Sequence, residues 1–180
     1  NAQSVVYNGN ALNTTTFSAS ASNYTATGYK NSDSASNTPL SFSGSLGFTS
    51  GGSAATVLNA GAYDFTAGTL AVTTSNANYR VVLAGTLSHQ YVVTPATVGL
   101  SASKVYDGTT DFTAGTAGTV FTITTGIGSQ TLGISGTGSS SNANVLGASS
   151  LNTTGLSLLN GTGAASNYVL PASTSNVSIT

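Results

Sequence analysis

The chain has 180 residues and a formal net charge of −1 at pH 7, with three Lys or Arg and four Asp or Glu, and it contains no Cys, Met or Trp. Hydrophobic residues make up 39% of the sequence, which argues against disorder, because disordered chains combine low hydrophobicity with high net charge. The composition excludes disulfides and thiolate chemistry, offers no basic footprint for nucleic acid, and leaves no apolar run long enough for a membrane span.

Alternating apolar residues, typical of half-buried strands, recur along the chain and are separated by Gly-, Asn- and Ser-rich turns such as 50–53 and 136–142. Residues that usually fill exposed helical faces are scarce. The alternating sets are Leu40/Phe42, Leu46/Phe48, Leu70/Val72, Tyr79/Val81/Leu83, Leu87/His89/Tyr91/Val93, Phe121/Ile123, Leu132/Ile134, Leu156/Leu158 and Val177/Ile179. This pattern predicts an all-β fold of two tandem immunoglobulin-like β-sandwich units, with β-grasp-like units as the alternative.

A repeat divides the chain into a first unit, 1–95, and a second unit, 96–180. The sequence around Tyr7 returns around Tyr106, and Asn78-Tyr79 returns as Asn167-Tyr168. Each unit is predicted to end in a strand, at 90–94 and 175–180. A lead-in strand is expected at 96–102, and the first unit has no counterpart to it. Because the chain does not begin with Met, we expect a processed or excised segment.

The second unit resembles the YDG and related MBG-type repeats of filamentous-haemagglutinin-like bacterial adhesins. The residues that carry the resemblance are Thr94-Pro-Ala96, Ala102-Ser-Lys-Val-Tyr-Asp-Gly-Thr-Thr110, Asn144-Val-Leu-Gly147, Gly155-Leu-Ser-Leu158 and Asn167-Tyr-Val-Leu170. The first unit matches less closely, with Asn8 in place of the usual Asp. The resemblance implies a stalk module of a secreted, surface-attached adhesin, and no enzymatic activity.

The repeated motif itself has the composition of a tight turn. Asp-Gly and Asn-Gly suit such turns, because Gly accepts positive φ and Asp or Asn bonds the following backbone. The preceding Tyr is expected to bury its ring and to bond a backbone group through its hydroxyl. The predicted structural turn residues are Tyr7, Asn8, Gly9, Tyr106, Asp107 and Gly108.

Candidate chemistry is sparse. His89 is the only histidine and lies in a strand pattern, without a nucleophile elbow elsewhere. Asp107 and Asp111 could bind calcium, but their spacing is not that of a calcium loop and the chain has no Glu. A lysine and an Asn could form an isopeptide bond, for which no buried acid is evident. We therefore expect no catalytic residue, no metal site and no cofactor.

Five Asn residues fit the N-glycosylation pattern, which also arises by chance in a chain so rich in Asn and Thr. These candidates are Asn13, Asn23, Asn152, Asn160 and Asn176.

Three functions follow from these observations. The leading hypothesis is a non-enzymatic, extracellular structural or adhesive module of a bacterial surface fibre or adhesin stalk. The second is a self-polymerising filament subunit joined by β-strand donation, because few Lys or Pro residues guard the strand edges. The third is a glycan-binding module that uses Tyr24 and Tyr29. The expected partners are neighbouring copies or repeats, or host and matrix glycans, with no nucleic acid and no membrane span.

Overall fold

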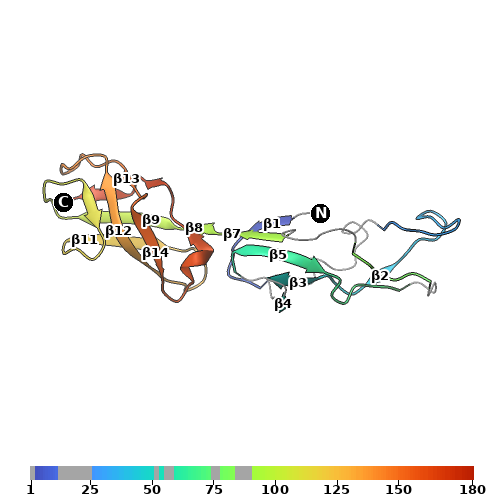
Figure 1. Ribbon diagram of the computed structural model, residues 1–180. Coiled ribbons are helices and arrows are strands. Elements are labelled where there is room, and N and C mark those ends of the chain that lie inside the picture. The colour runs from blue at the N-terminus through green and yellow to red at the C-terminus, as the bar shows by residue number, and fades with distance from the viewer. Residues whose placement is uncertain (1–2, 12–25, 51–52, 55–58, 74–77, 84–90) are drawn as a thin grey trace. The chain divides into compact units, whose positions relative to one another are not determined.

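The computed structural model describes residues 3–11, 26–50, 53–54, 59–73, 78–83 and 91–180, and the regular secondary structure in them is almost entirely β-strand (Figure 1). Within them the only helical element is the short 3₁₀ turn η2, Ala165–Asn167. The all-β prediction is confirmed, and the helix that a β-grasp-like unit would pack on its sheet is not among the described residues. No helix in this part of the chain is long and apolar enough to cross a membrane.

The chain folds as two compact units. One comprises Asn1–Val5 with Asn10–Val93, and the other comprises Val6–Gly9 with Thr94–Thr180. The boundary between Val93 and Thr94 lies two residues before the predicted boundary between residues 95 and 96. The sequence-based division assigns Val6–Gly9 to the first unit, whereas this segment packs as part of the second.

The first unit contains a sheet with the strand order β1-β7-β5-β3-β4 and a separate strand pair, β2-β6. Its core is an aromatic cluster in which Phe48 lies 5.3 Å from Phe65 and 5.6 Å from Tyr91, between ring centroids. The strands are β1 (Gln3–Val6), β2 (Phe42–Ser43), β3 (Gly47–Ser50), β4 (Ser53–Ala54), β5 (Gly61–Thr66), β6 (Ala71–Val72) and β7 (Tyr91–Thr94).

One predicted strand of the first unit is wrong. Residues 78–83 contain the alternating set Tyr79, Val81 and Leu83 but form no strand. No neighbouring strand pairs with this segment among the described residues, and Val82 is 68% exposed. The Tyr79 hydroxyl is bonded to the Asp33 carboxylate at 2.6 Å instead. Alternation alone does not make a strand when no partner edge is present.

The second unit contains two principal sheets. One has the order β11-β9-β17, and the other has the order β10-β12-β13-β16 with β14 also paired to β12. The strands are β8 (Ala96–Thr97), β9 (Gly99–Lys104), β10 (Asp111–Thr113), β11 (Thr119–Thr124), β12 (Leu132–Ser140), β13 (Leu151–Asn152), β14 (Leu156–Asn160), β15 (Tyr168–Val169), β16 (Ser173–Thr174) and β17 (Val177–Ile179).

Side chains from both principal sheets meet in one hydrophobic core, as in a β-sandwich. Leu100 and Ala102 of β9 and Ile179 of β17 contribute from one sheet. Phe112 and Leu151, both completely buried, contribute from the other. The lead-in strand expected at 96–102 is present as two pieces: β8 pairs in parallel with β15, and β9 lies between β11 and β17.

The long strand β12 changes partner along its length (Figure 1). Its first half, Leu132–Gly136, pairs with β14, and its second half pairs with β10 and β13. Gly136 marks the change with a φ of +90°, and a Cβ there would lie 2.1 Å from the Gly155 carbonyl oxygen. A glycine is needed at this bend because no side chain fits between the two backbones.

Candidate functional site

The predicted turn Tyr106–Gly108 forms next to a buried lysine. Along β9 the side chains of Leu100, Ala102 and Lys104 alternate onto the core face, and all three are buried. The Lys104 side chain is only 1% exposed. A lysine ammonium is rarely buried unless it is paired and hydrogen-bonded, so its surroundings decide whether the fold tolerates it.

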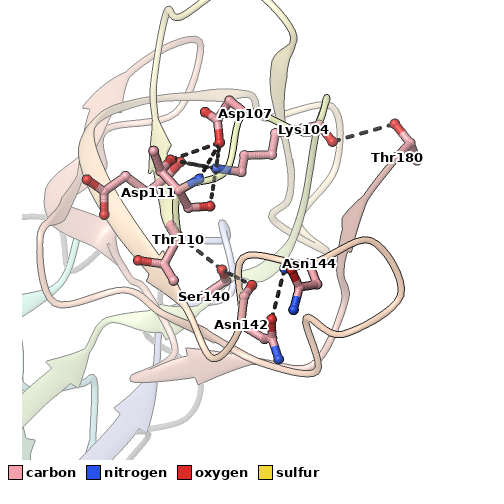
Figure 2. A network of polar contacts seen from close by, with 9 residues as sticks. Lys104, Asp107, Thr110, Asp111, Ser140, Asn142, Asn144 and Thr180 are labelled. Atoms are coloured by element: carbon pink, nitrogen blue, oxygen red, sulfur yellow. Dashed lines mark hydrogen bonds and ion pairs between the residues drawn. The ribbon is translucent and has the colours of Figure 1, made fainter.

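The Lys104 ammonium is surrounded by oxygen acceptors from the turn that follows it. Nζ lies 2.7 Å from Asp107 Oδ1, 2.7 Å from the Thr109 carbonyl oxygen, 2.9 Å from Thr109 Oγ1 and 2.9 Å from the Asp111 carbonyl oxygen. Figure 2 shows the side chain extending toward Asp107 and Asp111. The ring of Phe112 lies 5.2 Å from Nζ, within cation–π range. We call this arrangement the lysine cage: Lys104, Asp107, Thr109, Asp111 and Phe112.

Asp107 closes the turn. Its Oδ1 accepts hydrogen bonds from the Thr109 backbone N–H and the Thr109 hydroxyl, both at 2.9 Å, as well as from Lys104. These bonds favour the charged carboxylate, with the bond from Lys104 contributing most, and lower the pKa of Asp107 from 3.8 to about 2. Gly108 adopts a φ of +76°, as a tight turn at this position requires.

Tyr106 does not lie where the sequence predicts. Its side chain is 53% exposed, so the expectation of a buried ring is wrong at this position. Its backbone N–H donates to the Thr180 carbonyl oxygen at 2.8 Å, which fixes the residue beside the end of β17. The exposed ring has no role in the core of the unit.

Tyr7, in the other copy of the motif, is 6% exposed. Its ring packs edge-on against Tyr168, with 5.4 Å between centroids and an interplanar angle of 81°. Gln130 joins the two rings: Nε2 donates to the Tyr7 hydroxyl at 3.0 Å, and Oε1 accepts from the Tyr168 hydroxyl at 2.7 Å. The predicted backbone partner of the Tyr7 hydroxyl is thus replaced by a side chain. Gly9 has a φ of +78° and lies against Ile127.

The glycosylation candidates are dispersed. Asn152, Asn160 and Asn176 are all exposed, in β13, at the end of β14 and just before β17. Two of them use their side-chain oxygens locally: Asn152 Oδ1 accepts from Thr154, and Asn160 Oδ1 accepts from the Ala165 N–H at 2.8 Å. The candidates Asn13 and Asn23 lie outside the described residues.

The remaining candidates are His89, the two tyrosines of the glycan hypothesis and the possible metal ligands. His89 and Tyr24 lie outside the described residues. Tyr29 is half-buried and packs edge-on against Tyr79, with 5.9 Å between centroids. Within the described part of the chain, no group of three or more His, Cys, Asp or Glu side chains is placed to hold a metal ion.

The buried Lys104 is paired with an aspartate, whereas the isopeptide hypothesis requires a lysine and an Asn. A pKa of about 2 keeps the Asp107 carboxylate ionised near neutral pH, which favours an ion pair over amide formation. The two groups form an ion pair at 2.7 Å that holds the turn.

A shallow hollow of about 350 Å³ lies over β9, β11 and β17. Small hydroxyl, amide and aliphatic side chains line it, with no charged or aromatic residue among them. The lining residues are Ser101, Ala102, Ser103, Val120, Thr122, Ser175, Asn176, Val177 and Ser178. Such a surface offers neither a nucleophile with a base nor a stacking platform for a sugar.

Sequence reasoning missed several residues of this site, and Lys104 and Gln130 matter most among them. Lys104 has a weak signal, since it continues the alternation of Leu100 and Ala102 onto the buried face. Gln130 has none, because it is a polar residue in a turn region and its two partners lie far away in the sequence.

The comparisons with known proteins agree with the turn motif. Residues 89–176 match the family model described as the YDG domain. No curated protein and no solved structure matches the chain. The family match supports a YDG-type domain over residues 89–176, which is the part of the sequence resemblance that these comparisons confirm.

Proposed function

We propose that this chain is a non-enzymatic structural or adhesive module of an extracellular bacterial fibre or adhesin stalk, built from tandem immunoglobulin-like β-sandwich units. One observation carries the proposal: the charged groups of Lys104 and Asp107 are committed to holding a turn. Lys104 is buried and bonded to acceptors of its own turn, and Asp107 is bonded to Lys104 and Thr109. Groups bonded in this way are not presented to a substrate.

The extracellular location is supported by composition. A surface rich in Ser, Thr, Asn and Gly, with a net charge of −1, is solvated by hydrogen bonds and responds little to salt. Cell-surface and secreted stalks meet wide variation in salt and pH, and such a surface suits them.

The structural function is tested by the mass and particle shape of the purified chain. Light scattering combined with negative-stain microscopy should show a soluble monomer, elongated about twofold, as expected for two independent units in tandem. A compact globular particle, or hydrolytic activity that maps to described residues, would contradict the proposal.

A second function, polymerisation through strand pairing, is favoured by the edges of the β11-β9-β17 sheet. Both outer strands are terminal in the sheet order, and neither Thr119–Thr124 nor Val177–Ile179 contains a charged residue or a proline. Natural sheets usually guard such edges with Lys, Pro or a bulge. Regular filaments in the same microscopy experiment would place this function first. The glycan-binding hypothesis has no comparable support, because the Tyr29 ring packs against Tyr79.

A further inference from the structure

The two Tyr-x-Gly turns occupy the same structural position in their repeats. The Tyr7 N–H donates to the Thr94 carbonyl oxygen, and the Tyr106 N–H donates to the Thr180 carbonyl oxygen, both at 2.8 Å. The glycines that follow have nearly the same backbone angle, with φ of +78° at Gly9 and +76° at Gly108. Thr94 is the last residue of β7, and Thr180 directly follows β17.

The two turns differ in what covers them. Tyr7 is 6% exposed, whereas Tyr106 is 53% exposed. A Cβ at Gly9 would lie 2.4 Å from Ile127 Cγ2, whereas a Cβ at Gly108 would meet nothing within 4 Å. The first turn is therefore packed against protein at Tyr7 and Gly9, whereas the second presents the corresponding residues, Tyr106 and Gly108, to solvent.

The surface that covers Tyr7 consists of Ile127, Gln130 and Tyr168, which we call the tyrosine socket. Gln130 bonds the Tyr7 hydroxyl, Tyr168 receives the ring edge, and Ile127 touches the Gly9 backbone. The socket thus recognises three features of a Tyr-x-Gly turn: a hydroxyl, an aromatic ring and a position without a side chain. Tyr106 and Gly108 supply the same three features.

We propose that the exposed turn Tyr106–Gly108 docks into the tyrosine socket of a further YDG-type unit, so that the Tyr-x-Gly motif joins neighbouring units. This inference rests on the proposed structural function. The partner unit lies next to Thr180, as the unit that holds Tyr7 begins next to Thr94. The socket of this chain already contains Tyr7, so a separate second molecule of the same chain offers Tyr106 no empty socket. The partner must therefore be a unit whose socket lacks a tyrosine of its own.

The lysine cage prepares the exposed turn for this contact. Lys104 and Asp107 fix the turn from inside, and the Tyr106 N–H is held by Thr180. A recognition element that is already ordered loses little conformational entropy on binding. Binding then requires only that the Tyr106 ring leave water and enter the socket.

The test uses the full chain with a second copy of residues 95–180 added after Thr180. The new junction, Thr-Pro, is the same as the natural Thr94-Pro95 junction. Tyr106 of the added copy is changed to Phe, so that peptide mass spectrometry after nitration by tetranitromethane reports only the original Tyr106. The 180-residue chain is nitrated in parallel as the reference.

In the 180-residue chain, Tyr106 should react faster than Tyr7 by roughly tenfold or more, because reaction at a buried ring requires local opening. In the extended chain the original Tyr106 should slow to the rate of Tyr7. Gln130→Ala together with Tyr168→Ala in the added copy should restore fast nitration at Tyr106. The same pair of changes in the original unit should accelerate Tyr7 and leave Tyr106 protected, which makes it a matched control.

Two results would overturn the inference. The first is unchanged nitration of Tyr106 while the added copy is folded, as judged by protease resistance and circular dichroism. The second is failure of the added copy to fold, because Tyr106 should complete that unit as Tyr7 completes the present one. If Tyr106 stays reactive but the extended chain remains a string of folded units by small-angle scattering, docking fails and the structural function stands.

Discussion

Replacing Lys104 by Met tests whether the lysine cage stabilises the second unit. Methionine keeps the length and apolar stem of the side chain but removes its three N–H donors. The carbonyl oxygens of Thr109 and Asp111 then lose their bonds to the ammonium. The Asp107 carboxylate is half exposed and can be solvated by water, so the loss of its ion pair adds little to the loss of stability.

The magnitude follows from the two carbonyl groups. Each lost bond to a buried donor costs about 1–1.5 kcal/mol, so Lys104→Met should lower the free energy of unfolding by roughly 2–3 kcal/mol. For a unit of this size each kcal/mol shifts Tm by about 4–8 °C, which gives a decrease of roughly 10–20 °C. Circular dichroism melts measure the decrease, and hydrogen exchange in β9 assigns it to the second unit.

Lys30→Met is the matched control, because Lys30 is exposed and belongs to the first unit. It should change stability by less than about 0.5 kcal/mol. A Lys104→Met protein as stable as the wild type would refute the reasoning, since it would mean that burying the ammonium costs as much as its hydrogen bonds return. In the Lys104→Met background, Asp107→Asn should cost less than it does alone, because the two residues then no longer interact.

Three further predictions concern the second unit. The pKa of Asp107 is about 2 in the folded chain and 3.8 ordinarily, so unfolding at low pH takes up a proton. The free energy of unfolding should therefore fall from about pH 4 to pH 2 and level off below. Urea titrations should show a smaller fall for Asp107→Asn. Gly9→Ala and Gly108→Ala should each lower the free energy of unfolding by about 1–2 kcal/mol, because both positions have positive φ. Gly9→Ala should cost at least about 1 kcal/mol more, because its methyl group would collide with Ile127. Equal losses of stability in denaturant titrations would contradict the packing of Gly9. Phe112→Ala should cost about 3–5 kcal/mol, since this ring is completely buried, and a loss below about 1 kcal/mol by calorimetry would remove Phe112 from the core.

The strands of the second unit could be predicted where alternation and partner strands agree. Phe121 and Ile123 lie in β11, and Val177 and Ile179 lie in β17, on either side of β9. In 78–83 the same alternation yields no strand, because pairing depends on a neighbour that the local sequence does not specify. Periodicity therefore identifies the segments able to form strands, and the tertiary fold decides which of them do.

The candidate site was predictable as a turn but not as a structure with two different environments. The segments around Tyr7 and Tyr106 have similar sequences, so a local interpretation assigns both rings the same burial. The difference arises from Gln130 and Tyr168, which are distant in the sequence and hold Tyr7. Likewise, the acceptors of Lys104 include main-chain carbonyls, which carry no residue-specific signal.

The residues that differ between the two turns correspond to these two environments. Where the turn is packed, Val5 and Asn8 occupy the positions of Lys104 and Asp107, and the tyrosine socket holds the turn at Tyr7 and Gly9. Where the turn is exposed, no external surface restrains it, and the ion pair of Lys104 with Asp107 restrains it from within. An exposed loop with few external contacts otherwise samples many conformations, which would weaken any docking that depends on one of them. The lysine cage therefore belongs where the turn is presented, and its loss should loosen Tyr106 more than it would loosen a turn already held by a socket.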